Sequence, residues 1–122
     1  VYIFHKKNID KKKLKKFINT KAILLPIDWK NNFLDINKVI LKMGSLGVQR
    51  ILVEGGAELI TQLINKKLVD TLYWFRASKL IGNEGLNAVS NLSITKIKSV
   101  KELKLISSMQ IQSDTLEVYG RK

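Results

Sequence analysis

Residues 50–68 read RILVEGGAELITQLINKKL and carry the strongest structural signal in the chain. The run 51–53 is apolar on both faces, which predicts a strand buried inside a sheet. Leucine and isoleucine then recur at helical spacing over 59–64, which predicts an amphipathic helix. The pair Gly55 and Gly56 is therefore expected where a central strand turns into a helix.

Two glycines at this junction suit the binding of an anion. The first N–H groups of a helix lack intrahelical partners, and the helix dipole places partial positive charge there, so a phosphate is stabilised. Glycine adds access to positive φ and has no Cβ to hold a ligand away from the backbone. The spacing alone leaves two interpretations open, a phosphate cradle or a tight turn without a ligand. Neither the Rossmann pattern GxGxxG nor the P-loop pattern GxxxxGK[ST] occurs in the sequence.

Glu54 directly precedes the glycine pair. A carboxylate at the end of an apolar strand is costly to bury unless it is paired, and ligands of α/β sheets bind at the carboxyl ends of strands. Because a carboxylate and a phosphate do not favour the same spot, we expect Glu54 to face a hydrogen-bond donor of a different ligand group. The alternative is that Glu54 pairs with a nearby lysine or arginine.

The composition favours one globular domain over residues 1–122, with 45% hydrophobic residues and a modest core. There is no cysteine and only one histidine, His5, so disulfides, a cysteine nucleophile and a His- or Cys-based metal centre are not expected. No apolar run is long enough to span a membrane and no signal peptide is visible, which predicts a soluble, cytoplasmic domain. The chain starts at Val1 rather than Met, which indicates a fragment without its upstream part.

A formal net charge of +12 raises the hypothesis of nucleic-acid binding. The basic residues are nearly all lysines spread along the chain, and a compositional bias towards Lys, Ile and Asn explains them more simply. The dense lysine cluster at 11–16 is interrupted at helical spacing by Leu14, Phe17 and Ile18, so it is interpreted as the solvated face of a helix. Nucleic acid is thus the less favoured partner.

Strand and helix patterns alternate along the chain, which predicts a βαβ order with parallel central strands. Strands are expected over 1–5, 22–27, 50–54 and 70–77, with a weak one at 94–100. Helices are expected over 9–19, from an Asp35 cap to Gly44 or Gly47, and from Ala57 onward. Polar loops are expected over 28–32 and 78–91. The alternating runs 103–112 and 115–120 predict a terminal hairpin. The fold class is therefore α/β, with a mixed, mostly parallel sheet, flanking helices and a C-terminal antiparallel hairpin.

Three aromatic residues follow one another in the predicted strand at 70–77, so both of its faces are covered. Packing in a core is the favoured interpretation of Tyr73, Trp74 and Phe75, and stacking of one ring on a ligand is the alternative. The neighbouring Arg76 suits either a phosphate or Glu54.

Several short motifs together resemble one protein family. They read GVQRILVEGGAEL at 47–59, LVD at 68–70 and ASKLIG at 77–82. At this spacing they are similar to the C-terminal reductase domain of the bifunctional riboflavin-biosynthesis deaminase/reductase. The resemblance runs over nearly the whole chain and is sharpest from Gly47 to Gly82. One departure is Ala77-Ser78, where the family has Ala-Pro.

The resemblance implies a dihydrofolate-reductase-like fold and the activity of 5-amino-6-(5-phosphoribosylamino)uracil reductase, which reduces the ribose phosphate to ribityl phosphate with hydride from NADPH. It assigns Glu54 to the substrate and extends the Gly55 cradle into a cofactor-binding segment comprising Gly56, Ala57, Glu58, Leu59, Ile60, Thr61 and Gln62. It also implies a homodimer and suggests a cis peptide between the two glycines. No catalytic residue is assigned.

The front half of the family's domain, with most of the substrate contacts, would precede Val1, so this chain alone is expected to be inactive. Two alternatives are kept beside the riboflavin reductase. One is another pyrimidine or pteridine reductase of the same fold. The other is a non-enzymatic basic module that binds nucleic acid.

Overall fold

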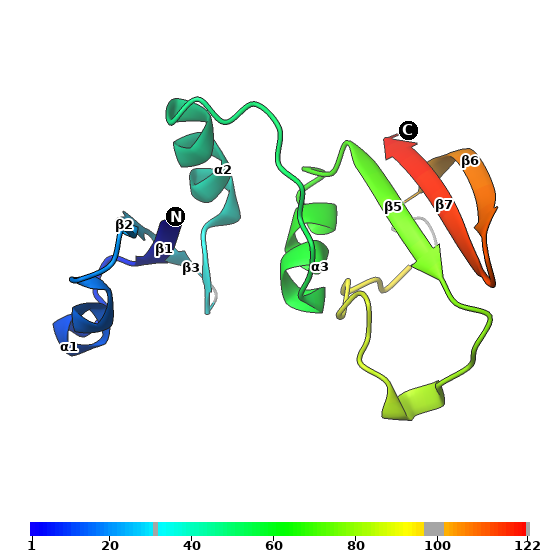
Figure 1. The fold of residues 1–122 in the computed structure, drawn as a ribbon, viewed down its shortest axis with the longest axis horizontal. Coiled ribbons are helices and arrows are strands. Elements are labelled where there is room, and N and C mark those ends of the chain that lie inside the picture. Colours follow the sequence, from blue (N-terminus) through cyan, green and yellow to red (C-terminus); the bar gives the residue numbers. More distant parts are fainter. Residues whose placement is uncertain (31, 97–101, 122) are drawn as a thin grey trace. The chain divides into compact units, whose positions relative to one another are not determined.

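The computed structural model describes residues 1–30, 32–96 and 102–121, and its contacts divide the chain into two compact units, Val1–Leu52 and Val53–Lys122 (Figure 1). Each unit is described by itself. The elements are β1 Tyr2–Lys6, α1 Lys11–Leu14, η1 Lys15–Phe17, β2 Ile23–Ile27, β3 Trp29–Lys30, β4 Phe33–Leu34, α2 Ile36–Ser45, α3 Ala57–Asn65, β5 Thr71–Arg76, η2 Gly82–Glu84, β6 Leu103–Ile111 and β7 Asp114–Arg121, where η marks a 3₁₀ turn. The single domain over 1–122 stays a prediction.

In the first unit β1 and β2 pair in parallel, with Phe4 opposite Leu25. The crossover that a parallel pair needs is supplied by α1 and η1, which confirms the predicted helix as two shorter turns. Asp10 caps α1 by accepting a hydrogen bond from the Lys12 N–H at 2.9 Å. The lysines at 11–16 are exposed whereas Leu14 is partly buried, as expected of a solvated helical face.

The segment predicted as a polar loop at 28–32 contains strand β3, which pairs antiparallel with β4, so that part of the prediction is wrong. Asn32 has a φ of 66°, a left-handed backbone that asparagine tolerates in tight turns. Trp29 lies opposite Leu34 in this small hairpin. Strands this short carry no periodic signal, so the sequence did not indicate the hairpin.

Helix α2 begins at the predicted cap, because the Asp35 carboxylate accepts a hydrogen bond from the Asn37 N–H at 3.1 Å. It ends before Gly47, whose φ of 84° is the left-handed conformation that commonly follows a helix. The buried apolar residues of the first unit are Ile27, Ile36 and Val39. The helix therefore directs one apolar side inward, as its spacing predicts.

In the second unit three strands form an antiparallel sheet in the order β5-β7-β6. The predicted strand at 70–77 and the predicted terminal hairpin are both confirmed, and Gln112 turns the hairpin with a φ of 54°. Residues 94–96 of the predicted weak strand are not in a strand, and its remainder lies outside the described residues.

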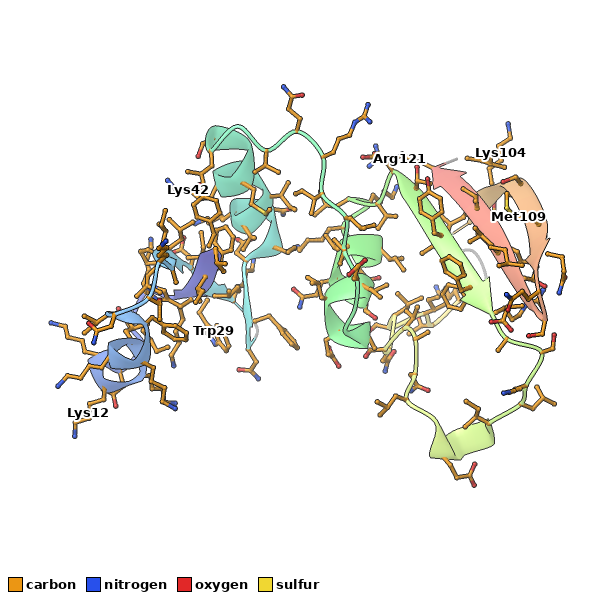
Figure 2. All side chains as sticks on the ribbon, viewed as in Figure 1. Lys12, Trp29, Lys42, Lys104, Met109 and Arg121 are labelled. Carbon is orange, nitrogen blue, oxygen red and sulfur yellow. The ribbon has the colours of Figure 1, made fainter. Side chains whose placement is uncertain are left out.

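One face of this sheet is apolar and largely exposed. Tyr73 lies opposite Val118, and both Phe75 and Met109 lie opposite Leu116, so these side chains share a face. Tyr73, Phe75 and Met109 are 57%, 67% and 50% exposed. Met109 is labelled in Figure 2. The prediction that Tyr73 and Phe75 are packed in a core is therefore not met in this structure.

The apolar run 51–53 does not form a strand, so the central strand that the sequence predicts is wrong here. Within the described residues no strand pairs with residues 51–53, and Leu52 is 77% exposed. A β-branched apolar run favours a strand only where a neighbouring strand and a core are available to it. The chain instead passes from one unit to the other at this run.

Within the described residues only the β1–β2 pairing is parallel, and the other three pairings are antiparallel. The α/β class and the C-terminal hairpin of the predicted fold are confirmed, but the predicted mixed, mostly parallel sheet is not seen, because each described sheet is either purely parallel or purely antiparallel. No helix in these ranges has the length and apolar character of a membrane span.

Candidate functional site

The glycine pair lies directly before α3 and adopts the backbone conformation for which glycine is needed. Gly55 has a φ of 137° and Gly56, the N-cap of α3, a φ of 83°. A Cβ built on either residue would meet nothing within 4 Å. The need for glycine is therefore conformational, and the backbone at this turn faces open space.

The suggested cis peptide between the two glycines is wrong, because the described residues contain no cis peptide bond. Positive φ values at both residues, which glycine adopts without steric cost, make the change of chain direction instead.

The start of α3 presents unpaired backbone donors. The first helical hydrogen bond runs from the Ile60 N–H to the Gly56 carbonyl at 3.1 Å. The N–H groups of Ala57, Glu58 and Leu59 precede it and have no partner inside the helix. The helix dipole adds partial positive charge at this end, so an anion that reaches the exposed glycine backbone meets complementary chemistry.

The predicted cofactor segment is not uniformly accessible. Gly55, Gly56, Glu58 and Leu59 are exposed; Ala57, Ile60 and Gln62 are partly buried. Thr61 is buried, with 5% of its surface exposed. Its side chain is therefore not available for direct contact with a ligand in this structure.

Glu54 is exposed, and within the described residues no hydrogen bond or ion pair engages its carboxylate. Pairing with a lysine or arginine, the alternative that the sequence left open, is thus not seen there. Arg76 pairs instead with Glu117, with 3.1 Å between Nη2 and Oε1. The same Glu117 accepts a hydrogen bond from the Tyr119 hydroxyl at 3.3 Å. Burial and the Glu117 carboxylate raise the pKa of that hydroxyl.

The predicted polar loop at 78–91 contacts α3, a contact that the sequence did not indicate. The backbone N–H of Ser90 donates to Thr61 Oγ1 at 2.7 Å, and the Ser90 hydroxyl donates to Glu58 Oε1 at 3.1 Å. Ser90 lies in a polar segment without periodicity, and its partners are far from it in the chain. No local pattern signals such a contact.

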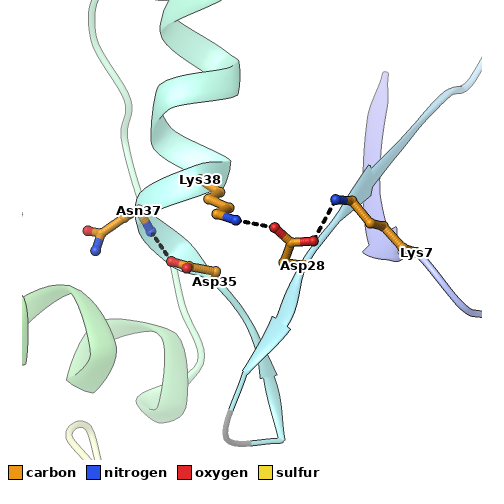
Figure 3. A network of polar contacts seen from close by, with 5 residues as sticks. All are labelled: Lys7, Asp28, Asp35, Asn37 and Lys38. Carbon is orange, nitrogen blue, oxygen red and sulfur yellow. Dashed lines mark hydrogen bonds and ion pairs between the residues drawn. The ribbon is translucent and has the colours of Figure 1, made fainter.

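Three charged residues of the first unit form a network of ion pairs, shown in Figure 3. Asp28, which follows β2, pairs with Lys7 at 2.6 Å and with Lys38 of α2. The hydrogen bonds from Lys38 and Lys7 lower the pKa of Asp28 to about 2, and Asp28 in turn raises the pKa of Lys38. The network joins the ends of three elements and neutralises part of the local basic charge.

Lys12, Lys42 and Lys104 extend into solvent from α1, α2 and β6 respectively (Figure 2). In the ranges that the structure describes, no group of three or more His, Cys, Asp or Glu residues is placed to hold a metal ion.

Two sequence comparisons agree with the motifs. The RibD C-terminal domain family matches residues 1–116. The riboflavin biosynthesis protein RibD of Actinobacillus pleuropneumoniae is 25% identical over 111 residues, which cover 90% of this chain and 30% of that relative. This chain therefore spans less than a third of the relative's length.

Three solved structures share the fold. Acinetobacter baumannii RibD has a TM-score of 0.73 at 12% identity, over 99% of this chain and 37% of that chain. A pyrimidine reductase-like protein from Corynebacterium diphtheriae has a TM-score of 0.73 at 16% identity, and the match covers 98% of this chain and 48% of that chain. A deaminase/5-amino-6-(5-phosphoribosylamino)uracil reductase from Thermotoga maritima has a TM-score of 0.62 at 12% identity, and the match covers 99% of this chain and 37% of that chain.

At these identities the solved structures support the fold alone, a mixed α/β fold similar to RibD reductase domains. The family match covers almost the whole chain, including the glycine pair and α3. The motifs, the matched residues and the fold together place this chain in the RibD C-terminal domain family.

Proposed function

We propose that this chain is the later part of a dihydrofolate-reductase-like domain with 5-amino-6-(5-phosphoribosylamino)uracil reductase activity. The observation that carries the proposal is the junction of Glu54 with an open glycine backbone at the start of α3, in a member of the RibD C-terminal domain family. The relative from Thermotoga maritima has this reductase activity in its name. As this chain covers only part of its relatives, the activity is proposed for the intact protein.

The proposed cofactor is NADPH, whose pyrophosphate fits the donor set at α3. The exposed backbone of Gly55 and Gly56 admits a phosphate, and the N–H groups of residues 57–59 donate to it. When bound, NADPH supplies the hydride. The protein holds the dinucleotide in one place, so the substrate carbon is presented to it at close range. Thr61 acts indirectly, because its hydroxyl is engaged with Ser90.

Glu54 is proposed to accept a hydrogen bond from the substrate. An exposed carboxylate beside a phosphate-binding turn binds a donor group, such as the amino or hydroxyl groups of a ribosylaminopyrimidine, in preference to another anion. In this arrangement Glu54 recognises the molecule being reduced, and the glycine backbone recognises the cofactor. The two functions are separable by mutation.

The test is NADPH oxidation by the intact protein with the ribosylaminouracil phosphate, with the ribityl product identified by mass. Glu54→Gln keeps the shape of the side chain and removes its charge. It should raise KM for the substrate about fivefold to tenfold, because a charge-assisted hydrogen bond becomes a neutral one, and leave the Kd of NADPH unchanged. Absence of NADPH oxidation with the wild-type protein contradicts the proposal.

A related pyrimidine reductase is the second candidate, favoured by the likeness to the Corynebacterium diphtheriae protein. A panel of pyrimidine and pteridine substrates distinguishes it, because only the preferred substrate combines a low KM with sensitivity to Glu54→Gln. Binding of nucleic acid predicts affinity that falls steeply with salt, and a mobility-shift titration is expected to show none at moderate salt. The homodimer stays a prediction that sedimentation of the intact protein checks.

A further inference from the structure

The loop after β5 is fixed to α3 through Ser90, which contacts two side chains on the same helix. Its backbone N–H donates to Thr61 Oγ1 at 2.7 Å and its hydroxyl donates to Glu58 Oε1 at 3.1 Å. Residues three apart in a helix lie on one face. One serine thus engages the first turn of α3 and the turn that follows it.

The Thr61 contact determines where Ser90 lies. Thr61 is buried, with 5% of its surface exposed, and a buried hydroxyl without a partner is costly. The short hydrogen bond to Thr61 therefore holds the backbone of Ser90 against α3. From this fixed position the Ser90 hydroxyl reaches Glu58.

Glu58 is the acidic residue in the first turn of α3. Its carboxylate is attracted to the same N–H groups and dipole that would bind a phosphate. In this structure the carboxylate instead accepts a hydrogen bond from Ser90, and no side chain caps the start of α3. Thr61, which holds Ser90, lies about 4.5 Å further along the helix axis than Glu58 at the usual rise per residue.

We propose that Ser90 is a positioning residue for the cofactor: its hydroxyl holds the Glu58 carboxylate away from the Gly56 backbone and keeps the start of α3 available to the pyrophosphate of NADPH. This inference rests on the proposed function. Ser90 acts through Glu58 and does not itself contact the cofactor.

The experiment is a fluorescence titration of the intact protein with NADPH. Ser90→Ala frees the carboxylate to compete with the phosphate and should raise the Kd about fivefold, the size of a charge effect at a helix end. Ser90→Thr keeps a hydroxyl and should restore wild-type affinity. Glu58→Gln removes the competing charge, so adding Ser90→Ala to Glu58→Gln should leave the Kd unchanged. Ser78→Ala is the matched control, because the Ser78 hydroxyl donates to the Ser113 carbonyl elsewhere.

Wild-type affinity in Ser90→Ala overturns the inference, and so does an equal loss in the Glu58→Gln background, which would mean that Ser90 only stabilises the loop. Glu58→Asp provides a second route if Ser90→Ala does not fold. Its shorter side chain keeps the charge but falls short of Ser90, so the same fivefold loss is expected, and unchanged affinity refutes the mechanism. A wild-type protein that does not bind NADPH at all contradicts the proposed function itself.

Discussion

Replacing Gly56 by valine tests the open backbone at the start of α3, and Gly47 supplies a matched control. The two residues have φ values of 83° and 84°. A Cβ at either position meets nothing within 4 Å. Gly56 is the N-cap of α3, whereas Gly47 lies just past the end of α2. Both substitutions thus place a side chain on a backbone with positive φ and introduce no steric clash, but only one lies at the proposed cradle.

The expected losses separate stability from binding. A backbone with positive φ costs a β-branched residue about 1–3 kcal/mol, so both Gly56→Val and Gly47→Val should lower the free energy of unfolding. Only Gly56→Val places a side chain where the phosphate would approach. The loss of one hydrogen bond from a backbone N–H to a charged phosphate, about 1.5–3 kcal/mol, predicts a Kd for NADPH raised about tenfold to a hundredfold.

Urea unfolding measures the first quantity and a fluorescence titration with NADPH measures the second, both on the intact protein. A lower free energy of unfolding in both variants, with a raised Kd in Gly56→Val alone, is the expected result. An equal Kd in the two variants would refute the phosphate cradle, because it would show that the backbone at Gly56 does not approach the cofactor.

Two further predictions concern stability. The pKa of Asp28 is lowered to about 2 from 3.8, so its ion pairs with Lys7 and Lys38 stabilise the fold above about pH 4 and cease to do so as the pH falls towards 2. Asp28→Asn should therefore be less stable than wild type at neutral pH, and the difference should vanish in acid unfolding experiments near pH 2. Thr61→Val should destabilise by about 1–3 kcal/mol, because the N–H of Ser90 loses its acceptor, whereas Thr61→Ser should cost less. Urea unfolding measures the stability of all these variants, and amide exchange at Ser90 measures the loss of its hydrogen bond in Thr61→Val.

Local patterns in the sequence were sufficient for several elements. The Asp35 cap and the apolar spacing after it predicted α2 because a helix start is encoded within a few residues. The alternating runs on either side of Ser113 predicted the β6–β7 hairpin for the same reason. The glycine pair before α3 was placed correctly at the start of a helix.

Features that depend on distant partners were missed. The run 51–53 has the composition of a buried strand, but composition does not supply a neighbouring strand, and none pairs with it in the described residues. The Ser90 contacts join residues of a loop and a helix about thirty positions apart. Arg76 left two partners open in the sequence, and the pairing of β5 with β7 provides a third, Glu117.

The apolar face of the β5-β7-β6 sheet has a consequence for handling the protein. Tyr73, Phe75 and Met109 are exposed on it, while the chain carries a net charge of +12. Repulsion between such charges keeps molecules apart at low ionic strength, but its range falls to about 8 Å in physiological salt. Attraction between apolar faces is short-ranged and is not screened. The colloidal stability of this chain should therefore fall as salt is added, so dilute, low-salt buffers should preserve a monodisperse sample.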